Sequence, residues 1–237
     1  FQPQIHALTH QIIGAEALIR WNHPEWGIVY PDDFIPIAEE TGMIIEIGKW
    51  IKETVCMQNK AWQNAGLPAI PISINLSAHR FLEKDLLTNI KEILAKTQLD
   101  PKYLQIEIVE TSILENEKVV FSILDELKKM GIKVFLDDFG TGYSSLSYLK
   151  RFKGRIDTLK IDRSFIQDLR REDRDSSSFI TKTIIELARH LEMDVVAEGV
   201  ETAEQLEILK EYNCNIIQGY LFSKPVPADE FAALLKK

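Results

Sequence analysis

The chain has 237 residues, of which 45% are hydrophobic and 27% charged, and 28 Lys+Arg against 36 Asp+Glu give a formal net charge of −8 at pH 7. This ordinary composition excludes wholesale disorder and fibrous repeats. The acidic balance argues against a general duplex-DNA binder, which needs a basic surface. The longest uncharged stretch, residues 61–79, carries two prolines, two asparagines and a glutamine, so it is not a membrane span. We expect a cytoplasmic protein in which Cys56 and Cys214 are buried free thiols rather than a disulfide.

Short β-branched segments alternate with longer amphipathic segments along the whole chain. The expected strands are Gln2–Ala7, Ile12–Ile19, Ile70–Asn75, Leu104–Val109, Lys133–Asp137, Ile156–Ile161, Val195–Glu198 and Asn215–Leu221. The expected helices are Asp33–Glu40, Ile44–Ala65, Glu83–Lys96, Lys118–Met130, Ser177–Leu191 and Glu204–Glu211. Such alternation indicates parallel strands with right-handed crossovers, so we predict one α/β domain over residues 1–237, a TIM-like (β/α)8 barrel. The first two strands are an exception, because the segment between them is too short for a crossover helix and predicts an antiparallel hairpin.

Polar residues lie at or near the end of nearly every expected strand. They are Glu16, Asn75, Glu107, Asp137 with Asp138, Lys160, Glu198 and Gln218. Residues that only filled a barrel would be apolar, and the carboxyl ends of barrel strands form the end where active sites lie. A single carboxylate at a strand end is commonly a solvated edge residue. The same pattern on six or seven strands instead predicts one convergent site.

The expected site is strongly acidic. It would gather eight carboxylates, those of Glu16, Glu107, Glu110, Asp137, Asp138, Asp162, Glu198 and Glu201. Only Arg20 and Lys160 would oppose them, and Arg20 shares a face with Leu18 if the second strand continues that far. A phosphate-bearing ligand would be repelled unless divalent cations reversed the charge, and oxygen donors without nearby His or Cys suit Mg²⁺ or Mn²⁺. The alternative is that some acids form buried ion pairs, above all Glu110 and Asp162.

Seven segments, in order along the chain, resemble the motifs of EAL-domain cyclic-di-GMP phosphodiesterases. They are EALIR (16–20), INLS (74–77), EIVE (107–110), DDFGTGYSSL (137–146), KIDRSF (160–165), AEGVE (197–201) and QGYLFSKP (218–225). The resemblance covers essentially the whole chain. It implies a barrel whose first strand is antiparallel to the rest, hydrolysis of cyclic-di-GMP to linear pGpG, and a homodimer built near the helices after Asp137 and Lys160.

The resemblance also implies a role for each matching residue. Two Mg²⁺ or Mn²⁺ ions would be held by Glu16, Asn75, Glu107, Asp137, Asp138 and Glu198. The catalytic group would be Glu198, Lys160, Glu16 and Gln218, with Lys160 orienting the attacking water. Substrate would be bound by Arg20, Leu18, Glu201 and Asp162, and Glu110 would anchor the glycine-containing loop that begins at Asp137.

Three features depart from the family's pattern, and none removes an implied ligand. The segment Lys150–Asp157 is about two residues longer than usual, and Val109 stands where many members carry Thr. The aromatic residues that usually precede FQPQ are missing, so we expect a fragment of a longer multidomain signalling protein with an N-terminal sensor or cyclase-like domain. The alternative function is a catalytically silent cyclic-di-GMP receptor or a protein-interaction scaffold. Silent members typically lose a metal ligand or degrade the loop, and neither loss is visible here.

Overall fold

Eight strands close into a barrel in the computed structural model, which describes residues 1–77, 81–83, 85–109, 117–140, 151–170 and 176–236. The strands, in their order around the barrel, are β1 (Gln2–His6), β10 (Ile216–Ile217), β9 (Asp194–Ala197), β8 (Thr158–Ile161), β7 (Lys133–Phe139), β6 (Leu104–Val109), β5 (Ile72–Leu76) and β2 (Ile12–Ala17). Strand β1 pairs antiparallel with both of its neighbours, and every other adjacent pair is parallel. The predicted barrel with an antiparallel first strand is therefore confirmed.

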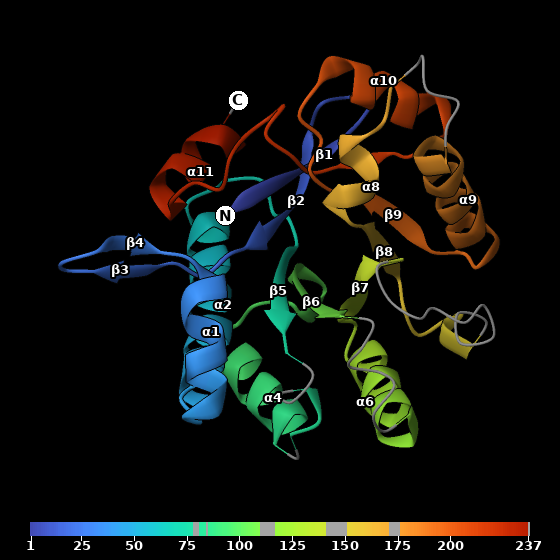
Figure 1. The fold of residues 1–237 in the computed structure, drawn as a ribbon. Coiled ribbons are helices and arrows are strands. Elements are labelled where there is room, and N and C mark those ends of the chain that lie inside the picture. Colours follow the sequence, from blue (N-terminus) through green and yellow to red (C-terminus); the bar gives the residue numbers. More distant parts are fainter. Residues whose placement is uncertain (78–80, 84, 110–116, 141–150, 171–175, 237) are drawn as a thin grey trace.

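Helices surround the ring of strands (Figure 1). They are α1 (Pro31–Glu40), α2 (Ile44–Asn64), α4 (Leu86–Thr97), α6 (Glu117–Lys129), α8 (Arg163–Gln167), α9 (Ser176–His190), α10 (Ala203–Glu211) and α11 (Ala228–Leu235), with a short 3-10 turn η1 (Pro101–Tyr103). In α6 the buried residues Val120, Ile123, Leu124 and Leu127 follow the spacing of one helix face. Helix α6 packs against β7, and its buried residues belong to one hydrophobic cluster with strand residues such as Ile106 and Ile108, so the main core lies between the barrel and its helices.

The two ends of the chain meet beside α11. The Phe1 ring contacts Trp62 of α2 and Phe231 of α11, with centroid distances of 5.0 and 5.9 Å. The terminal ammonium also donates to the carbonyl oxygen of Val226 at 2.7 Å. These contacts hold β1 in the barrel although it has no crossover helix of its own.

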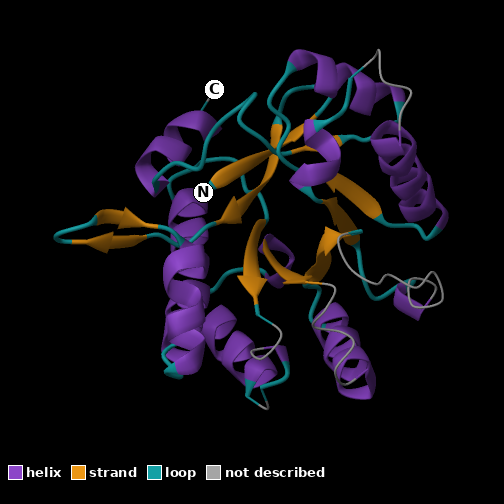
Figure 2. Cartoon of the chain, in the orientation of Figure 1, coloured by secondary structure: helices purple, strands orange, loops and turns teal. Residues whose placement is uncertain are grey.

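One hairpin stands outside the barrel and was not expected from the sequence. Strands β3 (Trp21–His23) and β4 (Gly27–Val29) pair antiparallel and project away from the ring (Figure 2). Two short helices, α8 and α11, were also missed. Each of these elements has eight residues or fewer, which is too short for hydrophobic periodicity to identify.

Three further predictions concern the two cysteines, the Lys150–Asp157 connection and the absence of a membrane span. Cys56 and Cys214 are buried free thiols, as expected. In the long Lys150–Asp157 connection, Phe152 and Ile156 are buried, while Lys150 lies outside the described residues. No helix within the described ranges combines the length and the apolarity needed to cross a membrane.

Candidate functional site

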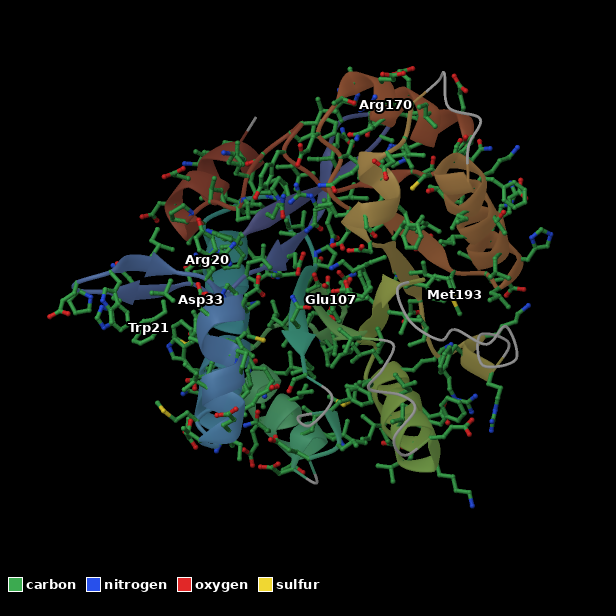
Figure 3. All side chains as sticks on the ribbon, viewed as in Figure 1. Arg20, Trp21, Asp33, Glu107, Arg170 and Met193 are labelled. Carbon is green, nitrogen blue, oxygen red and sulfur yellow. The ribbon has the colours of Figure 1, made fainter. Side chains whose placement is uncertain are left out.

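The polar strand ends converge on the ammonium of Lys160, which lies on β8 and is 1% exposed. Its Nζ lies 2.5 Å from Glu107 Oε2 and 2.8 Å from Glu198 Oε1. Asp137 Oδ2 and Glu16 Oε2 are also close, at 3.3 and 3.5 Å. Alternate residues of a barrel strand face inward, so side chains from β2, β6, β7 and β8 and the residue after β9 reach one point. Figure 3 labels Glu107 inside the ring of strands.

The carboxylate of Glu16 is held from both sides by side-chain amides. Asn75 of β5 donates to Glu16 Oε1 at 2.6 Å, and Gln218 donates to Glu16 Oε2 at 2.5 Å. Gln218 directly follows β10, and both it and Glu16 are 4% exposed. Both oxygens of this buried carboxylate therefore have a donor in addition to Lys160.

Strand β7 is irregular where its two consecutive carboxylates lie. Its register with β8 shifts between Leu136 and Phe139, and Asp138 has a positive φ of 55°. The Asp138 amide donates to Asp137 Oδ1 at 3.0 Å. A strand irregularity of this kind redirects side chains, so it explains how both acids are presented at one strand end.

The pKa values of the cluster show an excess of negative charge. Burial, reinforced by the charge of Glu16, holds the pKa of Glu107 well above its usual range. Burial likewise raises the pKa of Glu198 to about 8, although Lys160 opposes this. Burial lowers the pKa of Lys160, but the surrounding carboxylates outweigh it and hold that pKa well above its ordinary value. One cation does not neutralise this many carboxylates, so further positive charge would stabilise their ionised forms.

The oxygen-rich donor set fits Mg²⁺ or Mn²⁺ in its chemistry. Glu107 Oε1 is buried and has no hydrogen-bond partner among the described atoms, so it has an acceptor position to offer. The arrangement itself is not a formed metal site, because no group of three or more His, Cys, Asp or Glu in the described residues is placed to hold an ion. The four carboxylates turn toward Lys160 instead, and a cation would compete with its ammonium for them.

A cavity of about 490 Å³ opens above this cluster. The residues that line it are Gln2, Glu16, Leu18, Asp32, Asn75, Asp137, Lys160, Arg163, Glu198, Gly199, Glu201, Gln218, Gly219 and Tyr220. The expectation that only Arg20 and Lys160 oppose the acids was wrong, because Arg163 also lines the cavity and lies 3.3 Å from Glu201. Sequence reasoning missed Gln2, Asp32 and Tyr220 as well. Only the alternation of Gln2 and Gln4 along β1 could have indicated inward polar side chains there.

The other expected site residues have different surroundings. Strand β2 ends at Ala17, so it does not continue to Arg20. Arg20 is not among the lining residues; its Nη1 donates to the Ile19 carbonyl at 2.7 Å, and its guanidinium lies 5.1 Å from the Tyr30 ring centroid. Figure 3 labels Arg20 near the base of the β3–β4 hairpin. Asp162 caps α8 by accepting from the Ser164 amide at 3.0 Å, and Glu110 lies outside the described residues.

A comparison with protein families matches residues 1–225 to the family described as the EAL domain. Among curated proteins, the chain is 40% identical over 233 residues to the "Bifunctional diguanylate cyclase/cyclic di-GMP phosphodiesterase MucR" of Pseudomonas aeruginosa. It is 43% identical over 231 residues to "Signaling protein YkoW" of Bacillus subtilis. These alignments cover 98% of this chain but only 33% and 28% of the two relatives, so the chain spans about a third or less of their length.

A solved structure with a bound nucleotide has the same fold. The "PaMucR Phosphodiesterase, c-di-GMP complex" is 40% identical to this chain and superposes with a TM-score of 0.90. The alignment covers 97% of this chain and 92% of that one. This likeness extends over the barrel and the elements that line the cavity.

Proposed function

This chain belongs to the EAL domain family, and we propose that it hydrolyses one phosphodiester bond of cyclic-di-GMP, giving linear pGpG in bacterial second-messenger signalling. The observation that carries the proposal is the cluster of Glu16, Glu107, Asp137 and Glu198 around Lys160. All of these residues except Glu107 line an open cavity. Relatives of this chain are named for cyclic-di-GMP phosphodiesterase activity, and a similar structure is a c-di-GMP complex. Because the chain spans a fraction of those relatives, we also propose that it is a domain of a longer cytoplasmic signalling protein with an N-terminal sensor or cyclase-like domain.

We propose that the oxygen donors hold two Mg²⁺ or Mn²⁺ ions. The proposed ligands are Glu16, Asn75, Glu107, Asp137, Asp138 and Glu198. Such ions supply charge neutralisation of the phosphate and activation of water. The chain's own groups contribute orientation and charge: Asn75 and Gln218 fix the Glu16 carboxylate, and Lys160 offers a buried ammonium to the negative charge that grows on the phosphate.

The substrate would be bound by residues on either side of this cluster. Leu18 and Glu201 line the cavity, and Arg20 and Asp162 are assigned to substrate from the family motifs. Arg20 would have to leave the Ile19 carbonyl to reach a phosphate, which a long guanidinium side chain can do. Glu110 is proposed to anchor the loop after Asp137.

The decisive test is hydrolysis by the purified chain. Cyclic-di-GMP is incubated with Mg²⁺, with Mn²⁺ and with EDTA, and the nucleotides are separated by chromatography. Metal-dependent formation of pGpG would support the proposal. Tight cyclic-di-GMP binding without any product would overturn the enzyme and establish the silent receptor instead. Activity that survives EDTA would contradict the metal-dependent mechanism while leaving hydrolysis in place.

We also propose that the chain forms a homodimer near the helices that follow Asp137 and Lys160. Residues 141–150 lie outside the described chain, but α8 is part of this region and packs against α9. At the start of α9, Phe179 is 71% exposed, which leaves a large apolar side chain at the surface. Light scattering that shows only monomer at high concentration, with and without cyclic-di-GMP, would contradict this dimer.

A further inference from the structure

A buried chain of amide hydrogen bonds runs from Gln4 to the Glu16 carboxylate. Gln4 is 3% exposed, and its Nε2 donates to Gln218 Oε1 at 3.2 Å. Gln218 Nε2 then donates to Glu16 Oε2 at 2.5 Å. We infer that Gln4 is a positioning residue, which selects the orientation of the Gln218 amide and through it the direction of the Glu16 carboxylate. This inference rests on the proposed function, because it gives Glu16 its part in that site.

The order of the strands explains why this residue comes from β1. Strand β1 lies between β2, which carries Glu16, and β10, which Gln218 follows directly. An inward side chain on β1 can therefore contact residues from both neighbours. The outward residues of the same strand, Pro3 and Ile5, line a different cavity on the other side of the sheet. Gln4 thus points to the site rather than to the helix layer.

The chemistry of an amide makes this orientation matter. The oxygen and the nitrogen of Gln218 have nearly the same size, so packing alone does not choose between the two orientations of the amide. When Gln218 Nε2 faces Glu16, the amide donates to the carboxylate. When Gln218 Oε1 faces Glu16 instead, the amide oxygen and the carboxylate oxygen are both acceptors and no hydrogen bond forms. Gln4 donates to Gln218 Oε1, and Gln2 Oε1 accepts from Gln218 Nε2 at 3.2 Å. Both β1 glutamines therefore favour the orientation in which Gln218 donates to Glu16.

Gly14 is an independent sign that the fold reserves space for Gln4. The two residues face each other in the β1–β2 register, and Gly14 has no positive φ that would require glycine. A Cβ at position 14 would lie 2.8 Å from Gln4 Oε1. An added Cβ would therefore force the Gln4 amide, the far end of a flexible side chain, to move, so a substitution of Gly14 is a second way to displace it.

The test compares Gln4→Met, which keeps the length of the side chain but removes its donor, with a matched control, Gln105→Met. Gln105 is a buried barrel glutamine on β6 whose Oε1 has no hydrogen-bond partner among the described atoms. Losing a group that orients a metal ligand typically lowers metal affinity or activity about 10–100-fold. We expect Mn²⁺ affinity by calorimetry and kcat to fall about 10-fold or more in Gln4→Met, with KM within about twofold. Gln105→Met should leave all three values within about twofold of the parent.

A second variant and a spectroscopic measurement separate positioning from folding. Gly14→Ala should reproduce the loss in kcat, with circular dichroism verifying that each variant is folded. In ¹⁵N spectra of metal-free protein, the Gln218 side-chain NH₂ signals, assigned through Gln218→Glu, should broaden or shift in Gln4→Met. Unchanged NH₂ signals together with parental kcat and Mn²⁺ affinity would overturn the inference. A parent without hydrolysis would overturn the proposed function alone, because the NH₂ signals of Gln218 still test the role of Gln4.

Discussion

At the scale of single residues, Lys160 is the cation that the acidic residues of the site surround. It is the buried cation within reach of four carboxylates, and those carboxylates also repel one another directly. Removing one acid therefore relieves repulsion among the rest, since the charge of Glu16 contributes to the raised pKa of Glu107. Function and stability should therefore respond in opposite ways to the loss of Glu107 or Glu198, whose pKa values are raised. The lowered pKa of Glu16 instead marks a carboxylate whose ionised form the fold stabilises.

We predict that Glu16→Ala and Glu198→Ala each suppress cyclic-di-GMP hydrolysis by about 10²–10³ or more, since a single preorganised contact is commonly worth that much. The melting temperature of Glu198→Ala should stay at or above that of the parent, because burial makes the ionised form of Glu198 unfavourable. Glu16→Ala should melt at a lower temperature, because it leaves the buried Gln218 amide without its carboxylate acceptor. Arg20→Ala should instead raise KM more than it lowers kcat, because its proposed partner is the substrate phosphate. Glu186→Gln, a change at an exposed position on α9, serves as the matched control. Parental turnover in Glu16→Ala would contradict the proposed ligand set.

The two cysteines should be chemically silent in the folded protein. Burial raises the pKa of Cys56 and of Cys214 to about 12, so almost no thiolate is present at neutral pH. A thiol reagent such as dithionitrobenzoate should therefore react with neither cysteine in native protein and with both in denaturant. Rapid labelling of native protein would show that these positions open to solvent.

At the scale of elements, the segments that follow β9 and β10 contact each other closely through their backbones. The segment after β10 crosses that after β9, where the Val200 amide donates to the Gln218 carbonyl and Leu221 donates back to Val200. Gly219 lies at this crossing, and a Cβ there would be only 2.1 Å from the Val200 carbonyl oxygen. The close approach of two backbones, rather than a special φ, requires glycine at this position.

Gly219→Ala should consequently destabilise the protein more than an alanine placed at a strained but open glycine. Gly42 supplies that control, because it has a φ of +76° and a Cβ added there would meet no atom of a non-neighbouring residue within 4 Å. We expect about 1 kcal/mol from Gly42→Ala, from left-handed strain alone, and at least about 2–3 kcal/mol from Gly219→Ala, from overpacking against backbone. Urea unfolding of both variants measures the difference, and equal losses would contradict the crossing as the cause.

At the scale of the whole molecule, the charge cluster links stability to pH. Burial raises the pKa of Glu198 from 4.5 to about 8, and Glu107 shifts in the same direction. Between pH 4.5 and about 8 the folded protein therefore binds more protons than the unfolded protein. Its free energy of unfolding declines as the pH rises through this range. Asp138, whose pKa burial also raises, adds to this decline, and the Phe1 ammonium, whose pKa burial lowers from 8.0, opposes it toward pH 8. The lowered pKa of Glu16 affects stability only below 4.5 and the raised pKa of Lys160 only above 10.5.

We predict that the melting temperature of metal-free protein falls as the pH rises from 5 to 8. Scanning fluorimetry in EDTA measures it, and Glu198→Gln should reduce the slope because it removes one of the carboxyl groups whose pKa is raised. Glu186→Gln should keep the parental slope. Saturating Mn²⁺ should flatten the dependence, since added positive charge favours the ionised carboxylates. A slope of opposite sign would mean that the unfolded protein binds more protons in this range, so that the fold lowers the pKa values of these carboxylates instead of raising them.

The sequence by itself was sufficient for the fold class, the antiparallel first strand and the set of strand-end residues. Hydrophobic periodicity and chain connectivity are local properties, and strands such as Leu104–Val109 were predicted with the bounds observed. The β3–β4 hairpin was not predicted, because each of its strands has only three residues and so shows no hydrophobic periodicity.

Only the tertiary structure decided which polar side chains meet. Barrel closure brings β1 between β2 and β10, so Gln2 and Gln4 join a site that no motif assigned to them. It likewise puts Arg163 on the cavity wall, while the end of β2 at Ala17 leaves Arg20 beside Tyr30. Sequence spacing specifies which face of a strand a residue occupies. The distances between residues on different strands depend on how the sheet closes, and that is a property of the whole chain.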